Sequence, residues 1–479
     1  MTRAQTDYLI IGAGAVGLTF ADTLLAEDPQ AHVTFVDKHA KPGGHWNDAY
    51  SFVALHQPST SYGVNSLAFP GEHVDTTGHN AGMLALASGP DVLAYFERVM
   101  DTVLLPTGRV AYHPLSEYRG EGRVVQLLSG EETQVDIRRR EVDGTFYQTS
   151  VPSTHTRNFA VDEGVRIEPP GLLPRLWMEA DDLPEHYVVL GAGKTAMDTV
   201  IWLLDAGVPD SAISWVCPRD SWLINRSRVQ PGEAGFQRAM DWQIAHFKTA
   251  IGAKDGADML RKMGEDGHFL RIDESVEPEM FHYATISEGE IAILRRVTDV
   301  IRAGRVKRIE PGRMVFAEKT VEVPQRTLFV DCTASAVPFE ARQQRTPVFT
   351  EDRIVLQPLH VPLVTLSAAV AAFLEVHCKD DAERNALAVP GPLTDTPQTY
   401  PYAFMTTMAN RRAWSQHAGL SAFLARSRVD PMGPTLATLM AKQSPLLARM
   451  AEMGEWAQKA TPDLMRLAAE AAAIHEKTS

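Results

Sequence analysis

The sequence predicts an α/β fold with two Rossmann-like dinucleotide-binding domains and a mostly helical C-terminal region. Two glycine fingerprints support this prediction, each directly after a short apolar run, and they lie about 180 residues apart. From about Pro358 onward the chain is rich in alanine, leucine and methionine, and apolar residues recur at helical spacing in 432–453 and 460–474. The chain has 479 residues, 44% of them hydrophobic and 22% charged, which is typical of a globular protein with two or three domains.

The first fingerprint, G-x-G-x-x-G, follows the apolar run Tyr8–Ile11. Gly12 allows a tight turn after a buried strand, and Gly14 allows the backbone to approach a pyrophosphate. Gly17 allows the next helix to pack close to the sheet. The phosphates of a nucleotide are then expected at the positive N-terminus of that helix.

The segment after this helix supplies two further signals. A second strand, Val33–Val36, ends in Asp37, twenty residues after Gly17, where a carboxylate can bind a ribose hydroxyl. The G-G-x-W loop that follows contains Gly44 and Trp46, and small backbone beside a flat indole suits a flavin ring system. An aromatic loop that only covers the sheet edge is the alternative interpretation.

The second fingerprint, G-x-G-x-x-A, predicts another nucleotide site at Gly191, Gly193, Lys194 and Thr195. The strand after its helix ends near Arg219, and the guanidinium of an arginine suits the 2′-phosphate of NADPH. Asp220 could instead accept the ribose hydroxyls of NADH, so both cofactors stay open at this point.

The runs D-Y-L-I-I-G-A-G-A-V-G-L, V-D-K, G-G-H-W-N and A-L-H-Q-P-S resemble the start of a flavin-containing monooxygenase. The resemblance is specific over residues 7–66. It implies that the first fingerprint and Asp37 hold FAD, and that the loop of Gly44 and Trp46 lies against the flavin. It also implies a nested order, in which an NADPH domain is inserted into the FAD domain.

We therefore expect a first part of the FAD domain at 1–170 and an inserted NADPH domain at 171–335. A helical insertion is expected near 228–285, and 336–479 should return to the FAD domain and form the helical C-terminal region. Two helices are specifically predicted. One runs from the capping box of Ser287 and Glu290 to Gly304, and the other is the apolar segment 361–376, which is too short to span a bilayer and is predicted to be a buried helix.

The predicted reaction is a monooxygenation of a small or medium organic substrate, in which NADPH reduces FAD and dioxygen forms a flavin C4a-hydroperoxide. Candidate catalytic residues are those of the loops expected to line the flavin: His45, Asn47, His56 and Gln57. An FAD-dependent oxidase or dehydrogenase with a vestigial second site is one alternative. A non-catalytic nucleotide-binding sensor is another.

Cysteine spacing, net charge and the lack of targeting segments argue against several kinds of site and partner. The three cysteines, Cys217, Cys332 and Cys378, have neither C-x-x-C nor metal-ligand spacing, so neither a metal site nor disulfide-reductase chemistry is predicted. The net charge of −14 argues against nucleic acid or an anionic membrane as the main partner. Without a leader sequence or membrane span, a cytoplasmic protein is expected, and the apolar C-terminal helices fit either a core or a homodimer face.

Overall fold

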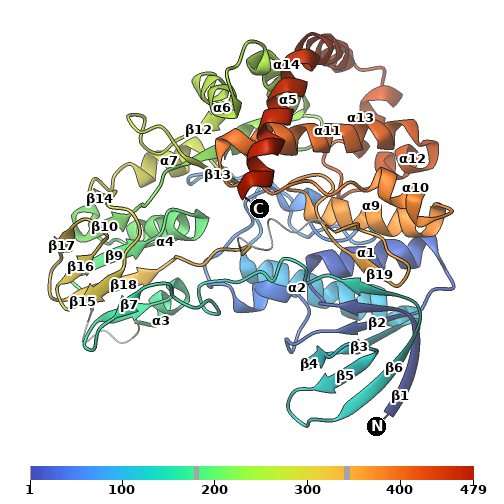
Figure 1. The fold of residues 1–479 in the computed structure, drawn as a ribbon, viewed down its shortest axis with the longest axis horizontal. Helices are drawn as coiled ribbons and strands as arrows, with labels where there is room; N and C mark the ends of the chain where they lie inside the picture. Colours follow the sequence, from blue (N-terminus) through green and yellow to red (C-terminus); the bar gives the residue numbers. More distant parts are fainter. Residues whose placement is uncertain (1, 177, 179–182, 339–345, 479) are drawn as a thin grey trace.

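The computed structural model describes residues 2–176, 178, 183–338 and 346–478. It contains a mixed sheet and a separate parallel sheet, and most of the C-terminal helices lie on the side of the first sheet where α9 (Val364–His377) packs (Figure 1). The predicted fold class, two Rossmann-like domains with a mostly helical C-terminal region, is confirmed.

The first sheet contains both the first fingerprint and the segment that returns to it late in the chain. Its strand order is β3-β2-β1-β6-β5-β4. In addition, β19 pairs with residues 141–143 of β6, whereas β5 pairs with residues 132–134. The strands are β1 (Thr2–Ile11), β2 (Val33–Val36), β3 (Val110–His113), β4 (Ser116–Tyr118), β5 (Arg123–Gln126), β6 (Glu132–Asp143) and β19 (Arg353–Val355). The pairs β3·β2, β2·β1, β1·β6 and β6·β19 are parallel, whereas β4, β5 and β6 form an antiparallel meander.

Two helices from distant parts of the sequence pack together on this sheet. Helix α1 (Ala15–Glu27) follows the first fingerprint, and α9 (Val364–His377) lies directly against it (Figure 1). Almost every residue of α9 is buried, as predicted for this apolar segment. The guanidinium of Arg140 on β6 lies 2.8 Å from Asp381 and 3.5 Å from Glu375, which further attaches the returning segment to the sheet.

The second sheet is entirely parallel, with the order β14-β10-β9-β18-β8. Its strands are β8 (Arg166–Glu168), β9 (His186–Leu190), β10 (Ile213–Val216), β14 (Val300–Ile301) and β18 (Thr327–Asp331). Helix α4 (Lys194–Asp205) follows β9 and begins at the second fingerprint. A small sheet of β7 (Ala160–Val161), β15 (Arg308–Glu310), β16 (Arg313–Val315) and β17 (Thr320–Glu322) packs beside it.

The helix predicted from Ser287 to Gly304 is shorter than expected. Its capping box is present, but α7 (Glu288–Leu294) ends ten residues before Gly304. Val300–Ile301 instead forms β14 and pairs with the edge of β10. Two β-branched residues beside an open sheet edge favour the strand, so tertiary pairing overrides the helical pattern here.

The predicted helical insertion contains strands as well as helices. Strands β11 (Ser221–Asn225), β12 (Phe269–Leu270) and β13 (Met280–Ile286) form a small sheet beside α5 (Phe236–Ala250) and α6 (Gly256–Glu265). An aromatic core joins these elements to α11 (Tyr400–Gln416) and to α14 (Ala448–Thr478), which is continuous through Pro462. Four further helices are described: α2 (Gly89–Val99), α10 (Asp381–Leu387), α12 (Ala418–Arg426) and α13 (Gly433–Ala441). None of the described helices is both long and apolar enough to cross a bilayer.

Candidate dinucleotide-binding sites

The first glycine loop has the geometry that a bound pyrophosphate requires. Gly12 adopts φ +96°, and its N–H donates a 2.8 Å hydrogen bond to the carbonyl of Val36. A Cβ on Gly17 would lie 2.2 Å from the carbonyl oxygen of Gly12, so only glycine permits this approach of α1 to the turn. Helix α1 begins after Gly14 without a side-chain cap. Its first N–H groups are therefore available to an anion.

Asp37 lies against this loop, at the end of β2. One carboxylate oxygen accepts a 2.6 Å hydrogen bond from the N–H of Ala13, inside the fingerprint. The other accepts from the N–H and the ring Nδ1 of His39, at 2.7 and 2.8 Å. The His39 ring also lies 2.8 Å from Asp48. The hydrogen bond to Asp37 has the largest effect on the pKa of His39, and together with Asp48 it raises this pKa. His39 was not among the site residues predicted from the sequence.

The G-G-x-W loop is attached to the fingerprint through its backbone. The N–H of Gly43 donates a 2.8 Å hydrogen bond to the carbonyl of Ala13. A Cβ on Gly14 would lie 3.5 Å from the Cα of Gly44, so the two glycine loops are in direct contact. The structure thus brings together the residues that the sequence predicted to bind the first cofactor.

The side chains of this loop have different partners. The indole N–H of Trp46 donates a 3.0 Å hydrogen bond to the hydroxyl of Tyr62, and the exposed ring of His45 stacks on the indole at 5.6 Å. The amide of Asn47 donates to the carbonyls of Gly44 and Lys41, at 3.0 and 3.2 Å. Asn47 therefore supports the shape of its own loop.

The second glycine loop has matching geometry. Gly191 adopts φ +122°, and a Cβ there would lie 2.7 Å from the carbonyl oxygen of Cys332 at the end of β18. The indole of Trp215 donates a 2.7 Å hydrogen bond to the carbonyl of Gly191. Helix α4 begins after Gly193 without a side-chain cap, and a Cβ on Gly193 would meet no atom within 4 Å. The N-terminus of α4 is therefore open to an anionic group.

Lys194 and Thr195 begin α4, but the Lys194 ammonium is directed into an ion cluster. It pairs with Asp198, one turn along α4, and lies 3.5 Å from Glu290 on α7. The Lys194 side chain is only 10% exposed. The carbonyl of Thr195 accepts a hydrogen bond from the hydroxyl of Thr199.

Arg219 and Asp220 follow β10, at the edge where the ribose of a dinucleotide is expected. Arg219 is exposed, and no ion pair of its side chain is observed with any described residue. Asp220, in contrast, is already paired: Arg302, which follows the neighbouring β14, donates to its two carboxylate oxygens at 2.8 and 3.0 Å. Arg302 also lies 3.2 Å from Asp273.

A buried arginine connects the second domain to the loop of His56. Arg226 is fully buried, and its Nε donates a 3.0 Å hydrogen bond to the carbonyl of His56. Its other nitrogens bind Asn80, the carbonyl of Thr285 at 3.2 Å and Glu290 at 2.5 Å. Burial opposes ionisation of Glu290, but Lys194 and Arg226 outweigh it and hold the pKa at about 2.

His56 is enclosed beside these charges. Burial, followed by the nearby Lys194, lowers the pKa of His56 to about 4, so the ring is neutral at pH 7. Its backbone carbonyl also accepts a 2.5 Å hydrogen bond from the hydroxyl of Thr285. Gln57 is half-buried next to it. Thus His56 and Gln57 lie near the second domain, whereas His45 and Asn47 lie in the G-G-x-W loop.

Comparison with known proteins places the chain in a family. A family described as "NAD(P)-binding Rossmann-like domain" matches residues 10–96. "Uncharacterized protein Rv2000" of Mycobacterium tuberculosis is 40% identical over 439 residues, which covers 91% of this chain and 80% of that protein. The chain belongs to the same family as this mycobacterial protein.

The chain is also similar to solved structures of flavoproteins. One is a flavin-containing monooxygenase from Stenotrophomonas maltophilia, with 15% identity and a TM-score of 0.40 over 73% of this chain and 84% of that one. Another is an oxidized steroid monooxygenase bound to NADP, with 13% identity and a TM-score of 0.48 over 78% of this chain and 84% of that one.

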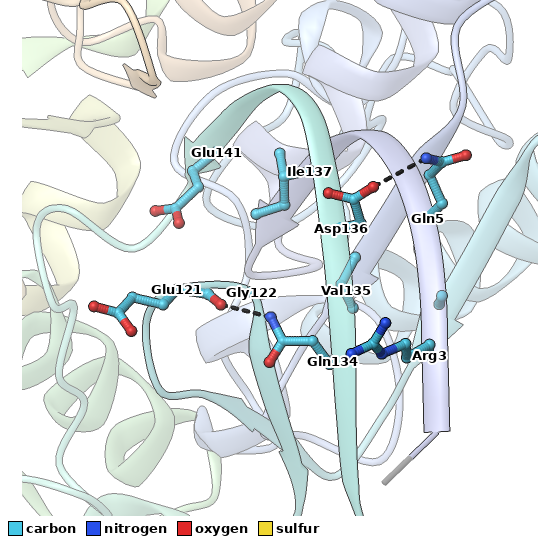
Figure 2. Close-up of a pocket in the computed structure, with 10 residues that line it drawn as sticks. Arg3, Gln5, Glu121, Gly122, Gln134, Val135, Asp136, Ile137 and Glu141 are labelled. Carbon is cyan, nitrogen blue, oxygen red and sulfur yellow. Dashed lines mark hydrogen bonds between the residues drawn. The ribbon is translucent and has the colours of Figure 1, made fainter.

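Two cavities lie outside the glycine loops. A cavity of 760 Å³ is lined by the start of β1, by β6 and by the β4–β5 turn (Figure 2). Its polar groups bond to each other, as in the 3.0 Å bond from Gln5 to Asp136, and it begins at the opposite end of β1 from Gly12. A second cavity of 360 Å³ lies between Asp48–Tyr50 and residues 152–153 and 169–172, next to the G-G-x-W loop. Of the two, only the second adjoins the predicted flavin site.

Proposed function

We propose that this protein is an FAD-dependent monooxygenase that is reduced by NADPH and oxygenates a small or medium organic substrate. The observation that supports this most directly is the pair of glycine loops, each at the end of a parallel strand and the start of an uncapped helix. Two loops of this geometry on one chain suit electron transfer between two dinucleotide cofactors.

The first loop fits FAD. The contacts of Gly12 with Val36 and of Gly17 with Gly12 leave a bare backbone turn at the N-terminus of α1. Asp37 stands beside this turn, and the G-G-x-W loop closes against Gly14. In this proposal the glycines and Asp37 bind the dinucleotide, while Gly44 and Trp46 lie toward the flavin ring.

The second loop fits NADPH better than NADH. A carboxylate binds the 2′-hydroxyl of NADH, but at this edge the charge of Asp220 is balanced by the guanidinium of Arg302, which donates to both of its oxygens. Arg219 is exposed at the same edge and can pair with a 2′-phosphate. The geometry of Gly191 and Gly193 also argues against a vestigial second site.

The residues between the two loops then serve to orient the cofactors. FAD at the first loop and NADPH at the second would supply the hydride-transfer and oxygen chemistry of the reaction. Loop 50–57 is held by hydrogen bonds to Arg226 and to Asp198, and Asp198 is in turn paired with Lys194. His56, neutral at pH 7, can donate a hydrogen bond without adding a charge beside the flavin. Together with His45, Asn47 and Gln57, it is a candidate to line the reaction site.

Anaerobic reduction of the bound flavin tests this proposal. NADPH should bleach the flavin absorbance without substrate, and NADH should do so more slowly. Oxygen consumption and product analysis with amine, sulfide and ketone substrates should then show incorporation of one oxygen atom. An oxidase would instead be reduced by its substrate alone, and a sensor would be reduced by none of these compounds. Either outcome would contradict the monooxygenase.

A further inference from the structure

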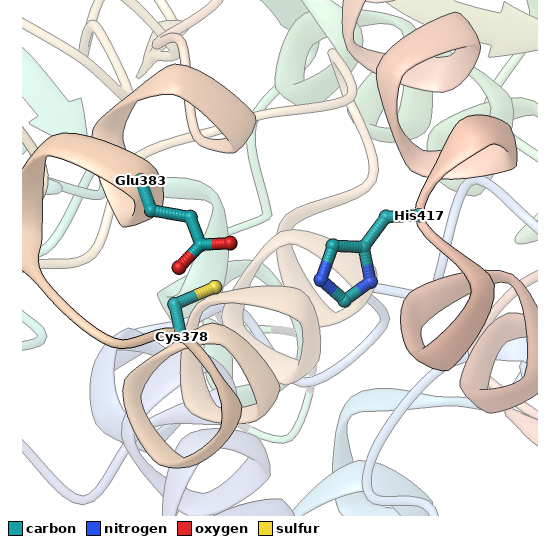
Figure 3. A group of neighbouring side chains, drawn as sticks. All are labelled: Cys378, Glu383 and His417. Carbon is teal, nitrogen blue, oxygen red and sulfur yellow. The ribbon is translucent and has the colours of Figure 1, made fainter.

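Three side chains that can bind a transition metal meet where several C-terminal helices begin and end. Cys378 caps the end of α9, Glu383 lies in the first turn of α10, and His417 joins α11 to α12. One donor atom from each residue lies within 4.8 Å of the other two. Figure 3 shows the Glu383 carboxylate and the Cys378 sulfur next to each other and facing the imidazole.

We propose that Cys378, Glu383 and His417 bind one divalent transition-metal ion, with Zn²⁺ as the best match. A thiolate, an imidazole and a carboxylate are the three ligand types that Zn²⁺ uses in proteins. A hard cation such as Mg²⁺ or Ca²⁺ would instead require mostly oxygen ligands. Because the protein supplies three ligands, water can take the fourth position.

The charges near the three residues favour a cation. In the described part of the chain, no basic side chain forms an ion pair with Glu383, which accepts only a 3.0 Å hydrogen bond from the N–H of Lys379. The guanidinium of Arg384 lies beside Cys378 and donates to its carbonyl, but its charge is paired with the carboxylates of Asp381 and Glu375. A Cys378 thiolate and the Glu383 carboxylate would together balance a divalent ion.

The geometry requires a small closure of the three side chains. Zn²⁺ bonds of 2.0–2.3 Å place tetrahedral ligand atoms roughly 3.3–3.8 Å apart, so donors that lie within 4.8 Å need to approach by about 1 Å. Cys378 is buried, whereas Glu383 and His417 are half-buried. Solvent access on one side gives the ion an entry path, and the buried side fixes the sulfur.

Binding also moves two protons without any redox change. A sulfur–metal bond forms as the Cys378 thiol loses its proton to solvent. His417 Nδ1 accepts a 3.1 Å hydrogen bond from the N–H of Leu420 and so caps α12. A metal bond to Nε2 requires the ring proton to move to Nδ1, which breaks this cap. The metal would thus replace a local cap by a bond that links α9, α10 and α12.

Cobalt and zinc titration of the full-length protein tests the proposal without any measurement of activity. After treatment with a chelator, Co²⁺ should bind at one ion per chain and produce a thiolate-to-cobalt charge-transfer absorption band, which Zn²⁺ then removes. Mass spectrometry under native conditions should confirm the stoichiometry. Saturation with Co²⁺ without this band would overturn the proposal, and this result requires no variant.

Variants identify the ligands. Cys378→Ser should abolish the band, and both Glu383→Gln and His417→Gln should weaken binding by more than the ~10–100-fold that loss of an outer partner costs. His377→Gln is the matched control, since His377 adjoins Cys378 but lies 2.8 Å from Glu27. Cys217→Ser controls for loss of a buried thiol. Wild-type affinity in Cys378→Ser, or an equal loss in His377→Gln, would refute the site.

Discussion

The hydroxyl of Tyr50 donates a 2.7 Å hydrogen bond to Asp198 and so joins the two dinucleotide-binding folds. Tyr50 follows the G-G-x-W loop of the first fold, and Asp198 lies on α4 of the second, where it also binds the ammonium of Lys194. Two residues further along, Phe52 stacks on Trp202 of the same helix at 4.9 Å. A polar and an aromatic contact therefore hold loop 50–57 against α4.

Replacement of Tyr50 by Phe should show how much this hydrogen bond contributes. We expect the free energy of unfolding to fall by about 1.5–3 kcal/mol, the usual range for a bond to a charged group. Urea denaturation followed by circular dichroism measures the loss. Tyr112→Phe is the matched control, because the buried Tyr112 hydroxyl has no hydrogen-bond partner among the described residues. Equal losses in both variants would show that the bond to Asp198 adds nothing.

Glu290→Gln should destabilise the protein more strongly. The substitution leaves Arg226, which is fully buried, without its carboxylate partner at 2.5 Å, and it also removes a charge near Lys194. Loss of one partner of a buried ion pair typically costs about 3–5 kcal/mol. Glu265→Gln, which removes an exposed pair with Arg261, should cost less than about 1 kcal/mol. Thermal unfolding of both variants compares them, and a similar shift in Tm would contradict the prediction.

A buried histidine should make the aromatic core sensitive to acid. His246 donates from Nδ1 to the carbonyl of Trp242 at 2.7 Å, and its Nε2 lies 2.5 Å from the hydroxyl of Tyr400. Burial lowers the pKa of His246 to about 3. Below pH 6.5, His246 is therefore protonated in the unfolded chain but stays neutral in the folded chain. The free energy of unfolding consequently falls as the pH decreases from 6.5 toward 3.

His246→Gln should remove this acid sensitivity. Between pH 7 and pH 5 the wild type should lose about 2 kcal/mol relative to the variant, at 1.36 kcal/mol for each pH unit below 6.5. Urea denaturation at both pH values measures the difference. The exposed His73→Gln provides the control. A difference between wild type and His246→Gln that is independent of pH would show that the folded protein accepts the proton.

Substitutions in the two glycine loops should have separate effects, one on FAD binding and the other on reduction by NADPH. Gly14→Val places a branched side chain against Gly44, where a Cβ alone already lies 3.5 Å from Cα, and it should abolish FAD binding. Gly191→Ala puts a Cβ 2.7 Å from the carbonyl of Cys332 at φ +122°. This second variant should keep its flavin absorbance but lose reduction by NADPH. Loss of flavin in Gly191→Ala would mean that the two sites are not independent.

Arg219→Ala should affect mainly the choice between nicotinamide cofactors. A charge-assisted pair with the 2′-phosphate contributes roughly 1.5–3 kcal/mol, or about a tenfold to hundredfold difference in Kd for NADPH. NADH binding should change little, because Asp220 is paired with Arg302 in either case. Arg296→Ala, an exposed arginine 3.7 Å from Asp210, is the control. Equal use of NADH and NADPH by the wild type would contradict this prediction.

Local patterns predicted the elements whose geometry a few adjacent residues impose. Gly12 and Gly17 indicated the tight turn and the close helix, and both constraints are present. The apolar segment 361–376 indicated a buried helix, and most of α9 (Val364–His377) is buried. The end of α7 was predicted wrongly, because β10 offers a pairing edge to Val300–Ile301 that no local pattern reveals.

The sequence by itself determined the two fingerprints, the strands and helices around them and the order of the domains' defining motifs, because steric limits on glycine act within a few residues. Only the tertiary structure decided which charges meet. Arg302 reaches Asp220 across 82 positions, Tyr50 reaches Asp198 across 148, and the three donors at Cys378, Glu383 and His417 come from separate helix ends. Side-chain charges carry no signal of their partner in the sequence, since ion pairing depends on distances that are fixed when the chain packs.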